Sequence, residues 1–231
     1  MAQKRENILI LAKTYPTPSA KNVETTCIAG INEDGEMRRL FPVPFRLLTK
    51  ESQFHKWQWI NVAIEKSSTD KRIESYKISF EDIRPGVILN TKQDWEKRIA
   101  WINRVPVVTK FLPDRSSPHL QKDQSLVLYK LQEPVRLEIV SSSTEWTTEE
   151  LRKLKQDGSL FSREEALLPP ALEKIPFDFY YRFKANTADG TGHEIRIKIT
   201  DWEAGALYRN CFRFYREQWQ SQFQQRLERD E

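Results

Sequence analysis

Two adjacent arginines in a strand-like stretch are the residues in this sequence best suited to bind a ligand. The stretch from Thr25 to Arg46 reads TTCIAGINEDGEMRRLFPVPFR, and Arg38 and Arg39 lead into an aromatic, proline-containing exit. Guanidinium groups bind phosphates and aromatic rings stack on bases, so this composition suits a polyanion. The pattern predicts a shallow groove that binds nucleic acid. We expect it to be formed by Lys13, Tyr15, Arg38, Arg39, Phe45, Arg46 and Trp57.

The same residues also allow a structural interpretation. Side chains alternate along a strand, so either Arg38 or Arg39 must share a face with core residues. That arginine would either reach the rim of the sheet, with its head in water, or be paired there. Trp57 and Trp59 share one strand face, where two indoles suit either a core or a base-stacking surface.

Charged residues near the C-terminal end form a second candidate site. A nucleic-acid surface there would use Arg182, Lys184, His193 and Arg196. A metal-dependent nuclease would instead use Asp178, His193, Glu194 and Lys198, because carboxylates beside a lysine can hold a divalent ion. On a strand, however, Glu194, Arg196 and Lys198 share one face, which is typical of a charge-paired outer surface. We therefore favour a non-catalytic protein with no metal and no cofactor.

Several other classes of protein fit the sequence poorly. It contains no glycine pattern of a P-loop or dinucleotide site and no Gly-x-Ser-x-Gly. Cys27 and Cys211 are too few and too far apart for a disulfide framework, and each is expected to be a small buried side chain. No apolar run approaches the roughly 18 residues of a membrane helix, and the short apolar run near the N-terminus is not expected to be a signal peptide. These features predict a cytoplasmic protein without a membrane partner.

Charge is distributed unevenly along the 231 residues. Residues 1–136 hold 23 Lys and Arg against 16 Asp and Glu, whereas residues 137–231 hold 14 against 17. An anionic partner on the first part is compatible with this asymmetry.

Hydrophobic alternation predicts a β-rich chain. Strands are expected at residues 7–14, 25–31, 36–41, 57–67, 72–80, 125–130, 134–141, 177–185 and 194–200, with Asp34 and Gly35 in the first hairpin turn. Helices are expected at 45–55, from 91 onward, at 147–156 with a Thr147–Glu150 capping box, and at 201–228 with a break near Arg213. The predicted fold is α+β, with two small OB-like or SH3-like β-barrel units. They span residues 1–88 and 125–231, joined by a helical segment and linker at 89–124, and the second carries an inserted helix and a C-terminal helix.

The first 90 residues resemble a known prokaryotic family. ILILAKT followed by CIAGINEDGEMRRLFPVPFR is similar to proteins that carry a dual OB (DuOB) domain. The matching residues are Cys27, Ala29, Gly30, Ile31, Arg39 and Pro42. The segment from Phe179 to Asn210 resembles the C-terminal part of related bacterial proteins, some with cysteines in the hairpin tip; residues 185–189 here hold none, so no zinc site is expected. The resemblance implies OB-type barrels, a nucleic-acid partner and a phage-defence or mobile-element setting, but no reaction.

These observations favour a nucleic-acid-binding protein or adaptor subunit. The alternatives are the metal-dependent nuclease and a scaffold whose C-terminal helix, residues 201–231, docks on a protein partner.

Overall fold

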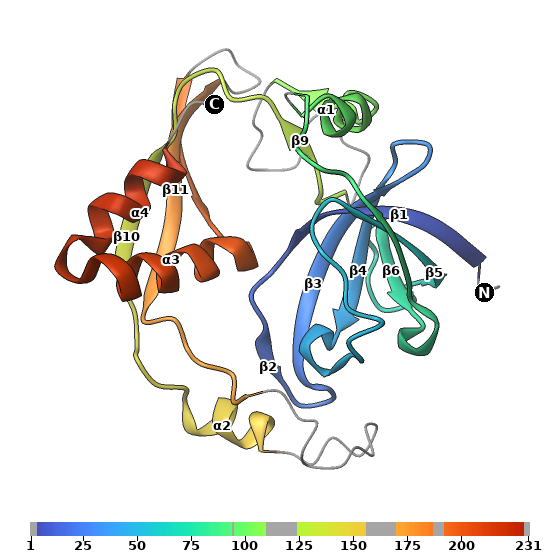
Figure 1. The fold of residues 1–231 in the computed structure, drawn as a ribbon, viewed down its shortest axis with the longest axis horizontal. Helices are drawn as coiled ribbons and strands as arrows, with labels where there is room; N and C mark the ends of the chain where they lie inside the picture. The colour runs from blue at the N-terminus through green and yellow to red at the C-terminus, as the bar shows by residue number, and fades with distance from the viewer. Residues whose placement is uncertain (1–3, 94, 110–123, 156–169, 187–191, 229–231) are drawn as a thin grey trace. The chain divides into compact units, whose positions relative to one another are not determined.

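The computed structural model describes residues 4–93, 95–109, 124–155, 170–186 and 192–228. The chain divides into two compact units. The first comprises Met1–Pro106, Gln121–Leu128 and Thr147–Leu172, and the second comprises Val107–Leu120, Tyr129–Trp146 and Glu173–Glu231. Figure 1 shows the elements of both units, each of which is described by itself below.

A closed five-stranded barrel forms the first unit. Its elements are β1 (Lys4–Lys13), β2 (Thr17–Ser19), β3 (Val23–Asn32), β4 (Met37–Val43), β5 (Gln58–Lys66), β6 (Ser75–Ile78) and β7 (Arg84–Ile88). The strands follow the order β1-β3-β4-β6-β5, and β5 pairs with β1 to close the barrel. β4 and β6 are parallel, whereas the other pairs are antiparallel. Strand β2 pairs with β3 and β7 pairs with β5.

Strand alternation builds the barrel core. In β5, Ile60, Val62 and Ile64 are at most 1% exposed and face inward, and the residues between them face outward. Burial of each such side chain contributes about 1.5–3 kcal/mol. Only glycine fits at position 30, because a Cβ there would lie 2.6 Å from the Leu9 carbonyl oxygen.

A second apolar layer covers the outside of the barrel. Helix α1 (Glu96–Ile102) brings Trp101 onto Trp59, with ring centroids 4.8 Å apart. Leu9 is fully buried in this outer cluster, so β1 is apolar on both faces. Two short strands, β8 (Val107–Val108) and β9 (Leu128–Tyr129), follow α1 in the sequence. Helix α2 (Thr148–Leu154) begins at the predicted capping box, which is confirmed.

The second unit is a three-stranded antiparallel sheet with a helix pair. Its elements are β10 (Arg136–Ser141), β11 (Phe177–Asn186), β12 (Gly192–Lys198), α3 (Trp202–Tyr215) and α4 (Trp219–Leu227). Phe179 of the sheet packs with Tyr208, Cys211, Trp219 and Phe223 of the helices in one core, and Figure 1 shows α3 and α4 beside β10 and β11.

Two details of the prediction differ from the structure. The described strands of the second unit form an open sheet instead of a barrel, because helices α3 and α4 bury its apolar face. The helix expected at 45–55 is a single 3₁₀ turn, η1 (Phe45–Leu47). Within the described part of the chain, no helix combines the length and apolar character needed to cross a bilayer.

Candidate nucleic-acid interface

Arg38 does not face solvent. It is 5% exposed, and its Nε and Nη2 donate to the two carboxylate oxygens of Glu6 at 2.8 and 3.1 Å. Nη2 also donates to Glu36 at 2.6 Å. Burial alone would raise the pKa of Glu6, but hydrogen bonds from Arg38 and Lys4 hold that pKa below its ordinary value. Of the two alternatives for this arginine, the structure shows the paired one.

Arg39 is enclosed in the same way on the other face of β4. It is 8% exposed, and its Nη1 donates to Asp70 and to the Ser75 hydroxyl, both at 3.0 Å. Its guanidinium carbon lies 4.5 Å from the Phe41 ring centroid. Hydrogen bonds from Arg72 hold the pKa of Asp70 well below its usual range. The expected solvent-facing arginine pair is therefore wrong, because carboxylates distant in sequence already bind both guanidinium groups.

The rest of the predicted groove is also occupied. Arg46 donates to Glu24 at 3.0 Å and to the carbonyl of Pro170. Phe45, which was expected to stack on bases, is 7% exposed and packs edge-on against Phe54 with ring centroids 5.0 Å apart. Lys13 lies over the Phe45 ring at 3.9 Å and donates to the Phe54 carbonyl. Tyr15 is half-buried.

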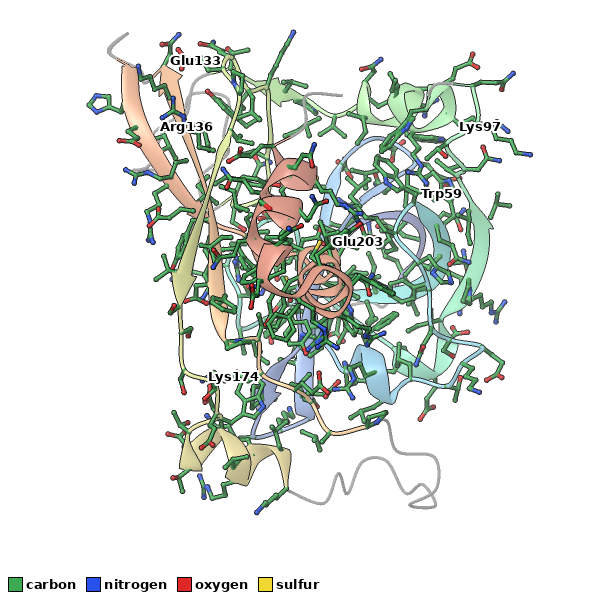
Figure 2. The ribbon with its side chains drawn as sticks, turned by 60° about the vertical axis from the view of Figure 1, so that its left-hand side comes forward. Trp59, Lys97, Glu133, Arg136, Lys174 and Glu203 are labelled. Carbon is green, nitrogen blue, oxygen red and sulfur yellow. The ribbon has the colours of Figure 1, made fainter. Side chains whose placement is uncertain are left out.

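Trp57 belongs to the outer apolar cluster of the barrel. It is half-buried, and the guanidinium carbon of Arg98 lies 4.9 Å from the ring centroids of both Trp57 and Trp95. Figure 2 labels the neighbouring Trp59 on the barrel. Of the two interpretations of these indoles, the structure shows the packed one, with Trp59 against Trp101 and Trp57 against Trp95 and Arg98.

Three of the four residues of the predicted second-unit site, Arg182, Lys184 and Arg196, lie on the outer face of the sheet. Arg182 and Arg196 stand opposite each other, and Arg196 lies 3.4 Å from the Tyr180 ring centroid. Both arginines are paired with carboxylates, Arg182 with Glu194 at 2.9 Å and Arg196 with Glu138 at 2.9 Å. The hydrogen bonds that Arg196 donates to Glu138 lower the pKa of that carboxyl group. The charge-paired outer face expected from alternation is thus present.

Lys184 shares this outer face, but His193 does not. Lys184 stands opposite Glu194, whereas His193 stands opposite Ala185, a buried residue of the inner face. Directly opposed residues of antiparallel strands point to the same side. The sheet therefore places His193 on the side opposite Arg182, Lys184 and Arg196.

The residues of the nuclease alternative are not brought together. Asp178 forms an ion pair with Lys198 at 2.7 Å, whereas Glu194 stands opposite Lys184, six residues farther along β11. Six residues of strand span about 20 Å, too far for a shared metal ion. The described residues include no group of three His, Cys, Asp or Glu suited to a metal.

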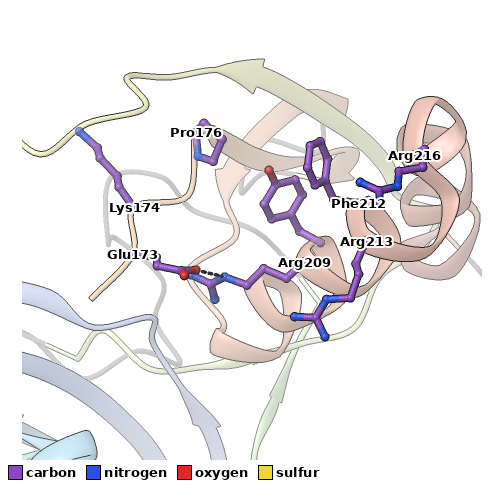
Figure 3. A pocket seen from close by; sticks show the side chains of 8 residues that line it. Glu173, Lys174, Pro176, Arg209, Phe212, Arg213 and Arg216 are labelled. Carbon is purple, nitrogen blue, oxygen red and sulfur yellow. Dashed lines mark ion pairs between the residues drawn. The ribbon is translucent and has the colours of Figure 1, made fainter. Parts of the chain in front are cut away.

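A basic and aromatic pocket lies on the helix side of the second unit (Figure 3). Its volume is about 340 Å³. Four cationic residues line it, Lys174, Arg209, Arg213 and Arg216, together with the aromatic residues Tyr208 and Phe212. Among its described lining residues, Glu173 is the single carboxylate, and it lies 3.2 Å from Arg209. We call this site the α3 pocket.

Helical spacing places these side chains together. Asp201 caps α3 by accepting from the Glu203 amide at 3.0 Å, and the helix then runs to Tyr215. Residues four apart share a helix face, so Arg209 and Arg213 lie on one side of α3. Arg216 follows the last residue of the helix, with non-helical backbone angles, and also lines the pocket. Figure 3 shows Arg216 beside Phe212 and Arg209 extended toward Glu173.

The end of α3 adds exposed rings and a strained backbone. Phe212 and Phe214 are 48% and 72% exposed. Arg216 adopts φ 49° and ψ −117°, a conformation that is costly for any residue with a side chain. The run RNCFRFYR, residues 209–216, could have revealed this surface from its helical spacing, although the segment was expected only to dock on a protein.

The structure thus defines a two-unit, β-rich protein with a closed barrel and a sheet-and-helix unit that carries the α3 pocket. Residues 4–104 match the family model described as Domain of unknown function (DUF8758), and residues 114–230 match that described as Domain of unknown function (DUF8757). The second match spans just over half of the chain, so the protein belongs to the DUF8757 family. No curated protein and no solved structure matches the chain.

Proposed function

We propose that the protein is a non-catalytic nucleic-acid-binding protein or adaptor subunit that contacts its ligand through the α3 pocket. The observation that carries the proposal is the convergence of Arg209, Arg213 and Arg216 on one cavity beside the exposed ring of Phe212. The arginines would neutralise phosphates, while Phe212, the exposed ring that lines the pocket, offers a face for base stacking.

The proposal moves the ligand surface away from the barrel. Arg38 and Arg39 already form ion pairs, and their release would take the main cationic partner from the half-buried carboxylate of Glu6 and one partner from Asp70. Among the described residues, by contrast, no carboxylate pairs with Arg213 or Arg216. The charges of Arg213 and Arg216 are therefore available to an incoming anion at little cost.

We further propose that the barrel is of the OB type, as the resemblance to dual OB proteins implies. The circular order β1-β3-β4-β6-β5 and its single parallel pair, β4 with β6, support a Greek-key barrel of five strands. In this proposal the barrel acts as the rigid body of the subunit.

Fluorescence anisotropy of the full chain tests the function. Labelled single- and double-stranded DNA and RNA are titrated at two salt concentrations against the parent and an Arg213→Glu/Arg216→Glu variant. Phosphate binding by arginines predicts an affinity that weakens steeply as the salt concentration rises. Each arginine–phosphate interaction that is removed should reduce the magnitude of the slope of log affinity against log salt concentration by about 0.7–0.9. The double variant should bind at least about tenfold more weakly.

A charge-matched variant separates the pocket from net charge. Lys92 and Lys97 are exposed residues of the first unit, and Lys97 projects from α1 in Figure 2. Lys92→Glu/Lys97→Glu makes the same change in net charge and should leave affinity within about twofold of the parent. Equal losses in the two variants would show that binding is non-specific charge attraction and would refute the proposed site.

A second candidate function uses the same surface. Phe212, Phe214 and Tyr215 expose large rings within the last turn of α3, and exposed aromatic and arginine residues are also typical of protein interfaces. A protein partner would bind this surface with an affinity that salt barely alters, whereas nucleic-acid binding would weaken steeply.

A further inference from the structure

One carboxylate already occupies the α3 pocket. Glu173 Oε2 lies 3.2 Å from Arg209 Nε, although the Glu173 side chain remains 76% exposed. Carboxylate and phosphate oxygens make the same charge-assisted hydrogen bonds to a guanidinium. An exposed pair of this kind contributes little to stability, so a ligand displaces it at small cost.

Displacement of Glu173 favours a ligand with more than one negative charge. A phosphodiester carries one negative charge, as the Glu173 carboxylate does. If a phosphodiester replaces Glu173 beside Arg209, the net charge of the site therefore stays the same. A phosphate monoester at the end of a strand carries about −1.5 to −2 at pH 7 and presents three acceptor oxygens. Its additional charge and oxygens match the additional cations, Arg213 and Arg216.

The dimensions of the pocket agree with a strand end. Its volume of about 340 Å³ is at the lower end of the roughly 300–1,000 Å³ typical of ligand pockets. Such a cavity accommodates one terminal group and its base, and the exposed ring of Phe212 lies on its wall for stacking.

We infer that the α3 pocket binds the terminal phosphate monoester of a nucleic-acid strand, and that Glu173 holds the phosphate position in the unliganded protein. This inference rests on the proposed function and specifies its ligand group. Glu173 thereby acts as a selectivity residue, because it competes with internal phosphodiesters more effectively than with a terminal phosphate.

The test compares single-stranded oligonucleotides of one sequence that differ only at their ends. Oligonucleotides of about 10 nucleotides carrying a 5′-phosphate, a 3′-phosphate or only hydroxyl ends are titrated against the full chain. One phosphorylated form should bind about fivefold more tightly than the hydroxyl form, as expected for a second charge shared by two exposed guanidinium groups. A nucleoside monophosphate should compete, whereas the matching nucleoside and inorganic phosphate should compete less. Equal affinity for all three oligonucleotides, or equal competition by the nucleoside, overturns the inference.

The variant Glu173→Gln tests the role of the carboxylate. It removes the competing charge while keeping the side-chain shape, so affinity for the hydroxyl-ended oligonucleotide should rise about threefold and the preference for the phosphorylated form should shrink. Glu203→Gln, an exposed position near the start of the same helix, makes the same charge change and should leave the preference unaltered. An unchanged preference in Glu173→Gln would overturn the role of Glu173.

The outcomes separate the two proposals. Binding that is lost in Arg213→Glu/Arg216→Glu but is indifferent to terminal phosphate would retain the proposed function and reject the strand-end inference. Failure of every oligonucleotide to bind would reject both.

Discussion

Arg38 donates two hydrogen bonds to Glu6, at 2.8 and 3.1 Å, across 32 residues of sequence. The pair joins β4 to β1 through side chains that are 6% and 13% exposed. A charged pair at this depth is valuable chiefly because either partner alone would be a buried, uncompensated charge. Arg38 and Arg39, the adjacent arginines of the sequence, therefore have a structural role in the barrel.

Removal of Arg38 should destabilise the barrel. Arg38→Ala leaves Glu6 without its principal partner, and we expect a loss of about 2–4 kcal/mol in the free energy of unfolding. Urea denaturation measures it. Lys4 also pairs with Glu6, but the Lys4 side chain is 55% exposed. Lys4→Ala should therefore lower the free energy of unfolding by less than about 1 kcal/mol. Equal, small effects of both substitutions would contradict a structural role for Arg38.

Acidification should weaken the Asp70 contribution to stability. The pKa of Asp70 is depressed in the folded protein from an ordinary value of 3.8 by hydrogen bonds from Arg72. A carboxyl group whose pKa is lower in the folded than in the unfolded protein stabilises the fold at pH values above the unfolded pKa. For Asp70 this contribution is lost progressively as the pH falls below about 3.8. The difference in unfolding free energy between the parent and Asp70→Asn should therefore be largest near pH 6 and shrink below pH 3.8. A difference that stays constant on acidification would contradict this linkage.

Replacement of Arg216 should separate stability from binding. Arg216→Gly relieves the positive φ and should raise the free energy of unfolding by about 1 kcal/mol, while nucleic-acid affinity falls. Arg216→Ala removes the same charge without the relief, so it should weaken binding equally and leave stability near that of the parent. Thermal unfolding and anisotropy together make the comparison. A gain in stability with undiminished affinity would exclude Arg216 from the ligand site.

Two glycines should respond in opposite ways to an added methyl group. A Cβ at Gly30 would meet the backbone oxygen of Leu9 at 2.6 Å, whereas at Gly192 it meets nothing within 4 Å. Gly30→Ala should therefore cost at least about 2–3 kcal/mol by forcing β1 and β3 apart, and Gly192→Ala should be nearly neutral. Chemical denaturation checks both, and a well-tolerated Gly30→Ala would show that the strands are less closely packed.

Local sequence signals predicted much of the secondary structure. Period-two alternation located β1, β3, β4, β5, β11 and β12 to within a few residues. Asp34 and Gly35 marked a turn in which Gly35 has φ 82°, and Thr147 with Glu150 formed the expected capping box. The break expected near Arg213 falls at Arg216, between α3 and α4. Each of these features depends on residues a few positions apart, so the local sequence contains the necessary information.

Burial of the arginines depended on partners that are distant in the chain. Glu6 and Asp70 lie 32 and 31 residues from Arg38 and Arg39, and no local pattern links them. The amino-acid sequence by itself determined which residues alternate, turn and cap, because those preferences are set by neighbouring side chains. Only the tertiary structure decided which cations are neutralised inside the fold and which remain at the α3 pocket, because that depends on which carboxylates the folded strands and helices bring within hydrogen-bonding distance.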